Sequence, residues 1–193
     1  MPDSRKPGGS IMCWPRTQAA NIEGRLKTPT RLSLPQSDQE ARRWGFEVSD
    51  EEDSFQWFKL GLMHQDDLRR AFAGWLDRPS QLLEAEDMQY RHETSATDLA
   101  KTYLRHLWER ILGETVTSFG AEREKIRELE LHVVIGVPAN WNRAAVDRLR
   151  HVVEEARIPG YHNHSSSLRF CIEPEAASMA LVGHYQLLPD LAV

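Results

Sequence analysis

The chain has 193 residues, which suits one domain, and 24 basic against 29 acidic residues give it a formal net charge of -5. This balance disfavours general nucleic-acid binding, which needs a basic face. The two cysteines, Cys13 and Cys171, lie far apart without a CxxC motif, so a disulfide framework or a zinc site is not expected. The sequence shows neither the apolar stretch of a signal peptide nor a run of membrane-spanning length, and we therefore expect a cytoplasmic protein with no membrane partner.

Short extended segments are expected in the first part of the chain, after a flexible tail at residues 1–10. Residues 26–34 suit a strand at the edge of a sheet, because Pro29 cannot donate to a strand ladder. Residues 44–48 are predicted to form another short strand.

The middle of the chain is predicted to be mainly helical. Residues 49–54 form an acidic loop, for which simple solvation explains the charges better than a bound cation. A helix is expected from Asp66, residues 77–96 are expected to be a loop, and Ser95 with Asp98 resembles a capping box at the start of a long helix. The apolar stripe of that helix consists of Leu99, Tyr103, Leu104, Leu107, Trp108, Ile111, Leu112 and Val116.

The last third predicts a strand–helix–strand crossover followed by a helix. Residues 131–137 and 168–172 are apolar and are predicted to be buried strands, and Asn142 can cap the helix between them. A crossover of this kind makes the two strands parallel. The expected inward faces of the two helices are Val146, Leu149, Val152, Val153 and Ala156 in the first, and Ala176, Ala177, Ala180, Leu181 and Tyr185 in the second, which has Pro174 at its first position.

Two residues at the ends of these strands are the candidate site. Pro138 follows the first strand and Glu173 follows the second, so both are expected on the carboxyl edge of the sheet, where α/β proteins bind ligands. A carboxylate there can hold a hydrated Mg²⁺ or orient a water molecule. The plainer alternative is that Glu173 only caps its helix and Pro138 only ends its strand.

Several motifs resemble one family. Residues 134–142, Val-Ile-Gly-Val-Pro-Ala-Asn-Trp-Asn, are similar to the V-x-V-P-A-x-[FW]-[ND] segment of the seventy-kilodalton heat-shock chaperones. Residues 172–178, Ile-Glu-Pro-Glu-Ala-Ala-Ser, are similar to the family's N-E-P-T-A-A-A segment, and residues 112–116 to its L-G-x-x-V helix end. Residues 44–48 and 57–60 resemble a divergent, fungal-type branch of the actin-like ATPase superfamily.

The resemblance implies an α/β fold, namely a partial actin-like, ribonuclease-H-like ATPase lobe with a parallel strand–helix–strand core and an added helical subdomain. It implies that residues 11–193 form part of a first lobe. Within it, about 49–130 would be the helical insertion and about 131–188 the core. The implied ligands are ATP and Mg²⁺, and the implied partners are protein clients or co-chaperones.

The resemblance also assigns roles to residues. Glu173 matches the glutamate that organises the magnesium ion and its waters, and Pro138 matches the proline proposed to relay nucleotide state. Lys59 is the counterpart of the family's catalytic lysine, although its surroundings differ and a surface lysine is the plainer interpretation. Ile172 and Glu175 depart from the family, which has asparagine and threonine at these places.

The family's phosphate loops have no counterpart in this sequence. Because backbone N–H groups of such loops hold the triphosphate, we expect the chain by itself to be a weak or inactive ATPase. The alternative function is a non-catalytic protein-interaction module on the same scaffold, with the aromatic-rich residues 44–76 as its surface. An unrelated α/β nucleotide enzyme would need a Gly-rich loop after a strand, and the sequence has none.

Overall fold

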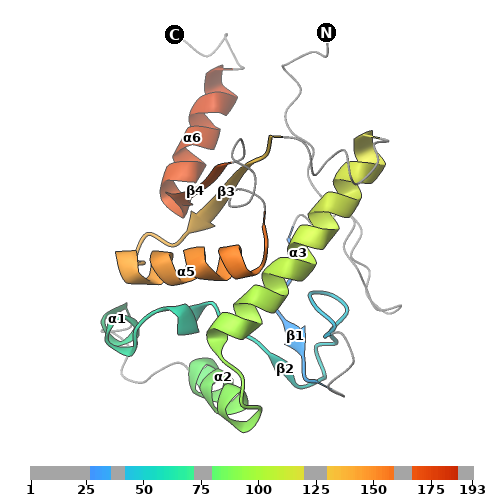
Figure 1. The fold of residues 1–193 in the computed structure, drawn as a ribbon. Helices are drawn as coiled ribbons and strands as arrows, with labels where there is room; N and C mark the ends of the chain where they lie inside the picture. Colours follow the sequence, from blue (N-terminus) through green and yellow to red (C-terminus); the bar gives the residue numbers. More distant parts are fainter. Residues whose placement is uncertain (1–26, 36–41, 72–79, 120–129, 159–166, 187–193) are drawn as a thin grey trace.

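The protein is mixed α/β in a computed structural model that describes residues 27–35, 42–71, 80–119, 130–158 and 167–186. The elements are β1 (Leu32–Ser33), β2 (Ser54–Phe55), the 3-10 helix η1 (Leu60–Leu62), α1 (Gln65–Ala71), α2 (Ser80–Arg91), α3 (Ala96–Phe119), β3 (His132–Val137), α5 (Arg143–Glu155), β4 (Ser167–Ile172) and α6 (Glu173–Gln186). Figure 1 shows the long helix α3 running between α5 and the small antiparallel β1–β2 pair.

The predicted parallel crossover is present. Strands β3 and β4 pair in parallel, and the register places Val137 opposite Ile172. The pair lies between α5 and α6 in Figure 1. Helix α5 covers one face, where the guanidinium of Arg150 lies 4.9 Å from the centre of the Phe170 ring. Helix α6 begins directly at the end of β4 and contacts both strands.

Helix α5 starts and packs as its sequence predicts. The side chain of Asn142 accepts a hydrogen bond from the backbone N–H of Ala145 at 3.0 Å, which satisfies one of the free donors of the first turn. Four of the residues expected to face inward are buried, and Val146 packs against the same core at its margin. The buried residues of this segment are Ala145, Leu149, Val152, Val153 and Ala156.

The prediction that both strands are buried was wrong for one face of β3 and for β4, in which Arg169 and Ile172 are exposed and the other residues are half-buried. Val133 and Ile135 pack against the core, whereas His132, Val134 and Gly136 are exposed. Val134 retains 58% of its surface. Among the described residues the side chains of β3 thus alternate between the core and solvent, as in a sheet with one packed and one solvated face.

The expected capping box ahead of α3 is confirmed for one of its two bonds, the one from the backbone N–H of Asp98 to Ser95. The hydroxyl of Ser95 accepts from the backbone N–H of Asp98 at 3.0 Å and donates to the Asp98 carboxylate at 2.6 Å. The hydrogen bonds from Ser95 and then Lys101 lower the pKa of Asp98 below its usual value. The helix then contributes Leu99, Ala100 and Tyr103 to the core.

Three predictions for the first half were wrong in whole or in part. Most of the expected loop at 77–96 is helix α2, because Gln, Leu, Glu, Ala and Met favour a helix even where few side chains are buried. Residues 44–48 are not a strand, since Trp44 makes a single antiparallel bridge to Leu32 and the chain then turns. The expected strand at 26–34 is reduced to the two residues of β1.

Helix α6 also departs from its prediction. It begins at Glu173, so Pro174 is its second residue. Ala176 is half-buried but Ala177 is exposed, which contradicts the inward face expected for it. The side chains of this helix beyond residue 179, residues 72–76 of the aromatic-rich segment and the tail at residues 1–10 lie outside the described part.

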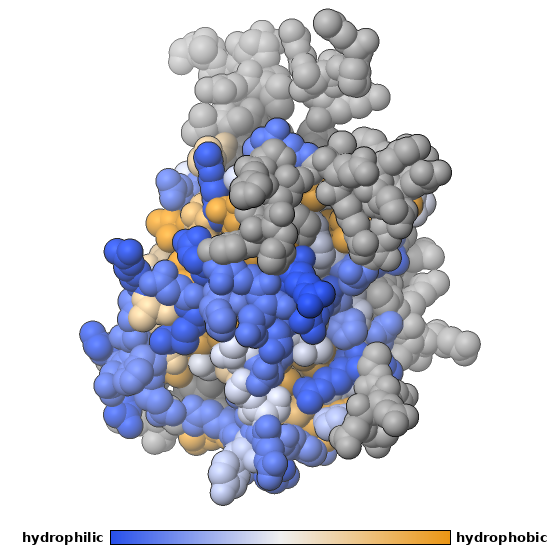
Figure 2. Space-filling model, viewed as in Figure 1, coloured by the Kyte–Doolittle hydropathy of each residue, from blue (hydrophilic) through white to orange (hydrophobic). Residues whose placement is uncertain are grey.

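Polar side chains predominate on the face of the molecule seen in Figure 2, with apolar patches between them. The described residues that are large, apolar and exposed include Trp57, Tyr90 and Met179. No helix in the described ranges has both the length and the apolar character needed to cross a bilayer.

Candidate functional site at the carboxyl edge of the parallel strands

Pro138 and Glu173 lie side by side at one edge of the sheet. Their predecessors, Val137 and Ile172, are register partners, and both strands point the same way. The juxtaposition expected from the crossover is therefore present. Ile172, which stands where the resembling family has asparagine, is exposed beside them and gives this edge an apolar element.

The side chain of Glu173 folds back over β3. A Cβ atom added to Gly136 would lie 3.6 Å from Glu173 Cγ, an ordinary van der Waals contact. As the first residue of α6, Glu173 also lies near the exposed backbone N–H groups of the helix start, which favour an anion. The carboxylate of Glu173 therefore lies at the carboxyl edge of the strands and is half-exposed to solvent.

Lys59 reaches this carboxylate from a distant part of the chain. Its Nζ lies 3.4 Å from Oε1 of Glu173, a contact between residues 114 positions apart. The backbone turns at Lys59 into η1, which packs against α3 and α5. The side chain is half-exposed, as a surface lysine would be, but its place at the carboxyl edge brings all three candidate residues together.

Trp141 is a residue of this site that the sequence analysis missed. Its ring lies under the ammonium group of Lys59, with 5.7 Å between Nζ and the ring centroid, and only 8% of its surface is exposed. Its backbone N–H donates to the carbonyl of Pro138 at 3.1 Å, which closes the turn after β3. The sequence gives a local signal for an aromatic residue in this turn, since Trp141 stands three positions after Pro138, but none for its contact with Lys59.

The ion pair between Lys59 and Glu173 contributes little to stability. Both side chains are half-exposed and the 3.4 Å separation is long for a charge-assisted hydrogen bond. Pairs of this kind contribute about 0.2–1 kcal/mol. Breaking this ion pair so that Lys59 or Glu173 can contact a ligand therefore costs little free energy.

A cavity of about 340 Å³ adjoins Lys59. This volume lies at the lower end of the range for small-molecule sites. Arg31 lines the same cavity, and its guanidinium is held by Asp50 at 2.6 Å. The other lining residues are Pro29, Thr30, Gln56, Trp57 and Leu60.

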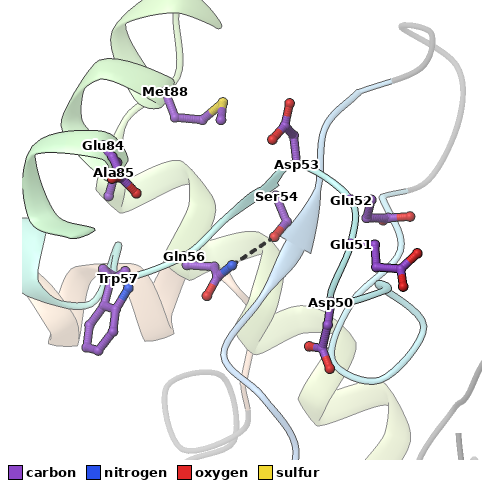
Figure 3. Close-up of a pocket in the computed structure, with 10 residues that line it drawn as sticks. All are labelled: Asp50, Glu51, Glu52, Asp53, Ser54, Gln56, Trp57, Glu84, Ala85 and Met88. Atoms are coloured by element: carbon purple, nitrogen blue, oxygen red, sulfur yellow. Dashed lines mark hydrogen bonds between the residues drawn. The ribbon is translucent and has the colours of Figure 1, made fainter. Parts of the chain in front are cut away.

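A second cavity, of about 310 Å³, lies on the acidic loop (Figure 3). Ser54 and Gln56 are joined across its floor by a 3.1 Å hydrogen bond. Its carboxylates are those of Asp50, Glu51, Glu52, Asp53 and Glu84, with Trp57, Ala85 and Met88 as apolar neighbours. In the part of the chain that the structure describes, no group of three or more His, Cys, Asp or Glu residues is arranged to hold a metal ion.

The carboxyl edge offers one carboxylate to a magnesium ion. That donor set fits a hydrated Mg²⁺, which keeps several waters and takes one or two carboxylates together with substrate phosphates. Glu173 would hold the ion through water. Glu175, the other acidic residue of the first turn of α6, is exposed.

Comparisons of the chain with protein-family models, with curated proteins and with solved structures give no match.

Proposed function

We propose that the chain is the ATP-facing part of a heat-shock-chaperone-like, actin-fold ATPase lobe. The observation that carries the proposal is the contact between Lys59 and Glu173 beside Pro138, at the carboxyl edge of a parallel strand pair. Lys59, Pro138 and Glu173 come from motifs far apart in the sequence and lie near one another at the carboxyl edge of the strands. In α/β sheets ligands bind at this edge.

The proposed roles follow from the charges at this edge. Phosphoryl transfer depends mainly on positioning and on neutralising negative charge. The ammonium of Lys59 would contact a phosphate oxygen, and the carboxylate of Glu173 would orient a water molecule. A magnesium ion, when bound, would supply further neutralisation of the phosphates.

The proposed activity of this chain alone is weak or absent. The sequence shows no phosphate-loop motif, and it is the backbone N–H groups of such loops that cradle a triphosphate. Steady hydrolysis together with tight Mg·ATP binding by the chain would contradict this part of the proposal.

Substituting Lys59 tests the proposed site. In an NMR titration of the ¹⁵N-labelled chain with Mg·ATP, we expect shift changes centred on Gly136, Trp141 and Glu173. The Lys59→Met substitution should weaken binding by about tenfold to a hundredfold, the usual effect of losing a hydrogen bond between charged groups.

The matched control is Lys101→Met. Lys101 is also paired with carboxylates, Asp98 at 2.9 Å and Glu155 at 3.0 Å, but it lies on α3 away from the carboxyl edge. This variant should bind as the parent chain does. Equal losses in both variants, or shift changes confined to other surfaces, would contradict the proposal.

A protein-interaction module is the second candidate, and Trp57 favours it. This side chain is 51% exposed, lines both cavities and has a left-handed backbone with a φ of 58°. Trp44, Phe55 and Phe58 are buried, so core packing explains most of the aromatic residues in this segment.

Trp57→Gly tests this second candidate. Glycine adopts the left-handed backbone conformation of residue 57 without strain, so the substitution removes the exposed ring without disturbing the backbone. We expect it to reduce partner recovery in pull-downs while the Mg·ATP titration stays unchanged. Unchanged recovery would argue against the interaction module.

A further inference from the structure

The ammonium group of Lys59 rests on two groups, a carboxylate and an aromatic ring. Glu173 accepts from it at a long 3.4 Å, and the ring of Trp141 lies 5.7 Å below it. The half-exposed ion pair is screened by water, whereas the ring is buried. The ring and the carboxylate therefore make comparable contributions to where the ammonium lies.

Trp141 is itself held firmly on both sides. Its backbone N–H is bonded to the Pro138 carbonyl, and the next residue, Asn142, caps α5. The amide of Asn142 also donates to the carboxylate of Asp67 in α1. The position of the ring is thus fixed relative to the end of β3, the start of α5 and the segment that follows Lys59.

Trp141 belongs to the buried core, which accounts for a large aromatic residue here but not for its polar atom. Trp141 Nε1 is buried and has no hydrogen-bond acceptor in the described part of the chain. A buried donor without an acceptor destabilises the fold, and phenylalanine would fill most of the same space without it. Tryptophan is, however, the aromatic residue that attracts a cation most strongly.

We propose that Trp141 is a positioning residue, which holds the Lys59 ammonium over the carboxyl edge so that an arriving anionic phosphate meets a fixed cation. The fixed place of the cation follows from the contacts above, and only the identity of the anion rests on the proposed function. When the anion binds, Lys59 would keep its contact with the ring of Trp141 and would replace its weak contact with Glu173 by a contact with the anion.

Side-chain NMR of the full chain tests the position of Lys59 directly. Protons above an aromatic ring are shifted upfield, so the Cε protons of Lys59 should resonate upfield of those of other exposed lysines. Trp141→Phe should reduce this shift and Trp141→Leu should abolish it. The Lys101 signals serve as the internal control and should not move.

Two further measurements, of stability in urea and of anion binding, distinguish a positioning role of Trp141 from a purely structural one. Trp141→Phe should change the urea midpoint little, because removing the unpaired donor offsets the loss of buried ring area. Trp141→Leu should weaken the binding of inorganic tripolyphosphate about two- to fivefold, as expected for a lost cation–π contact.

The outcomes are distinct. Unchanged Lys59 shifts in the folded Trp141→Phe variant, or a large fall in its urea midpoint without a change in Lys59, would overturn the positioning role. Upfield Lys59 signals that respond to Trp141 but not to Mg·ATP or tripolyphosphate would support positioning and would count against the proposed function alone.

Discussion

Replacing Phe58 by alanine should lower the free energy of unfolding by about 3–5 kcal/mol. Phe58 is 2% exposed, and its ring centre lies 6.0 Å from that of Tyr103 in α3. Removing the ring leaves a cavity between η1 and α3 that the surrounding side chains fill only in part. Since domains of this size are stable by about 5–15 kcal/mol, the loss is a large share of the total.

Urea denaturation followed by far-UV circular dichroism measures this loss. The matched control is Tyr90→Ala in α2, where 85% of the aromatic side chain is exposed. We expect that control to change stability by less than about 0.5 kcal/mol. Equal midpoints for the two variants would show that Phe58 is not part of the core.

The Gly61→Ala substitution should destabilise the chain by about 1–3 kcal/mol, although residue 61 is exposed. An added Cβ would lie 2.6 Å from the Cβ of Ala96, at the start of α3. That methyl group cannot move without the backbone, so η1 and α3 must separate. Because Gly61 follows Lys59 by two residues, the shift should also disturb the carboxyl edge.

Two other glycine-related variants make this test specific. Gly113→Ala, in the interior of α3 with nothing within 4 Å of the added atom, should stabilise the chain by about 0.5–1 kcal/mol. Ala96→Gly should recover part of the loss when combined with Gly61→Ala, which a double-mutant cycle in urea would measure. Additive effects in that cycle would contradict direct contact.

The sequence predicts the second half of the fold well because its signals are local. Asn142 caps a helix with a clear apolar face, and the crossover rule then makes the flanking strands parallel. That rule is sufficient to bring Pro138 and Glu173 together. It says nothing of what covers the sheet, which is why the burial of Val134 was predicted wrongly.

The first half was harder because its signals conflict. Among the residues of α2 whose burial is described, 83–91, only Ala85 is buried, so an apolar stripe was a poor guide and helix propensity decided the outcome. The approach of Lys59 to the carboxyl edge depends on how η1 packs against α5, a tertiary contact that no local pattern encodes. The same is true of the ring of Trp141 beneath it.

The pairing register of β3 with β4 limits where the sequence can tolerate insertions and deletions. Inserting or deleting one residue within either strand would turn every later side chain to the opposite face, and Glu173 would then point away from Lys59. Length changes in α5 or its connections leave that alternation untouched. Insertions and deletions in homologues of this chain are therefore expected between the two strands and not inside them.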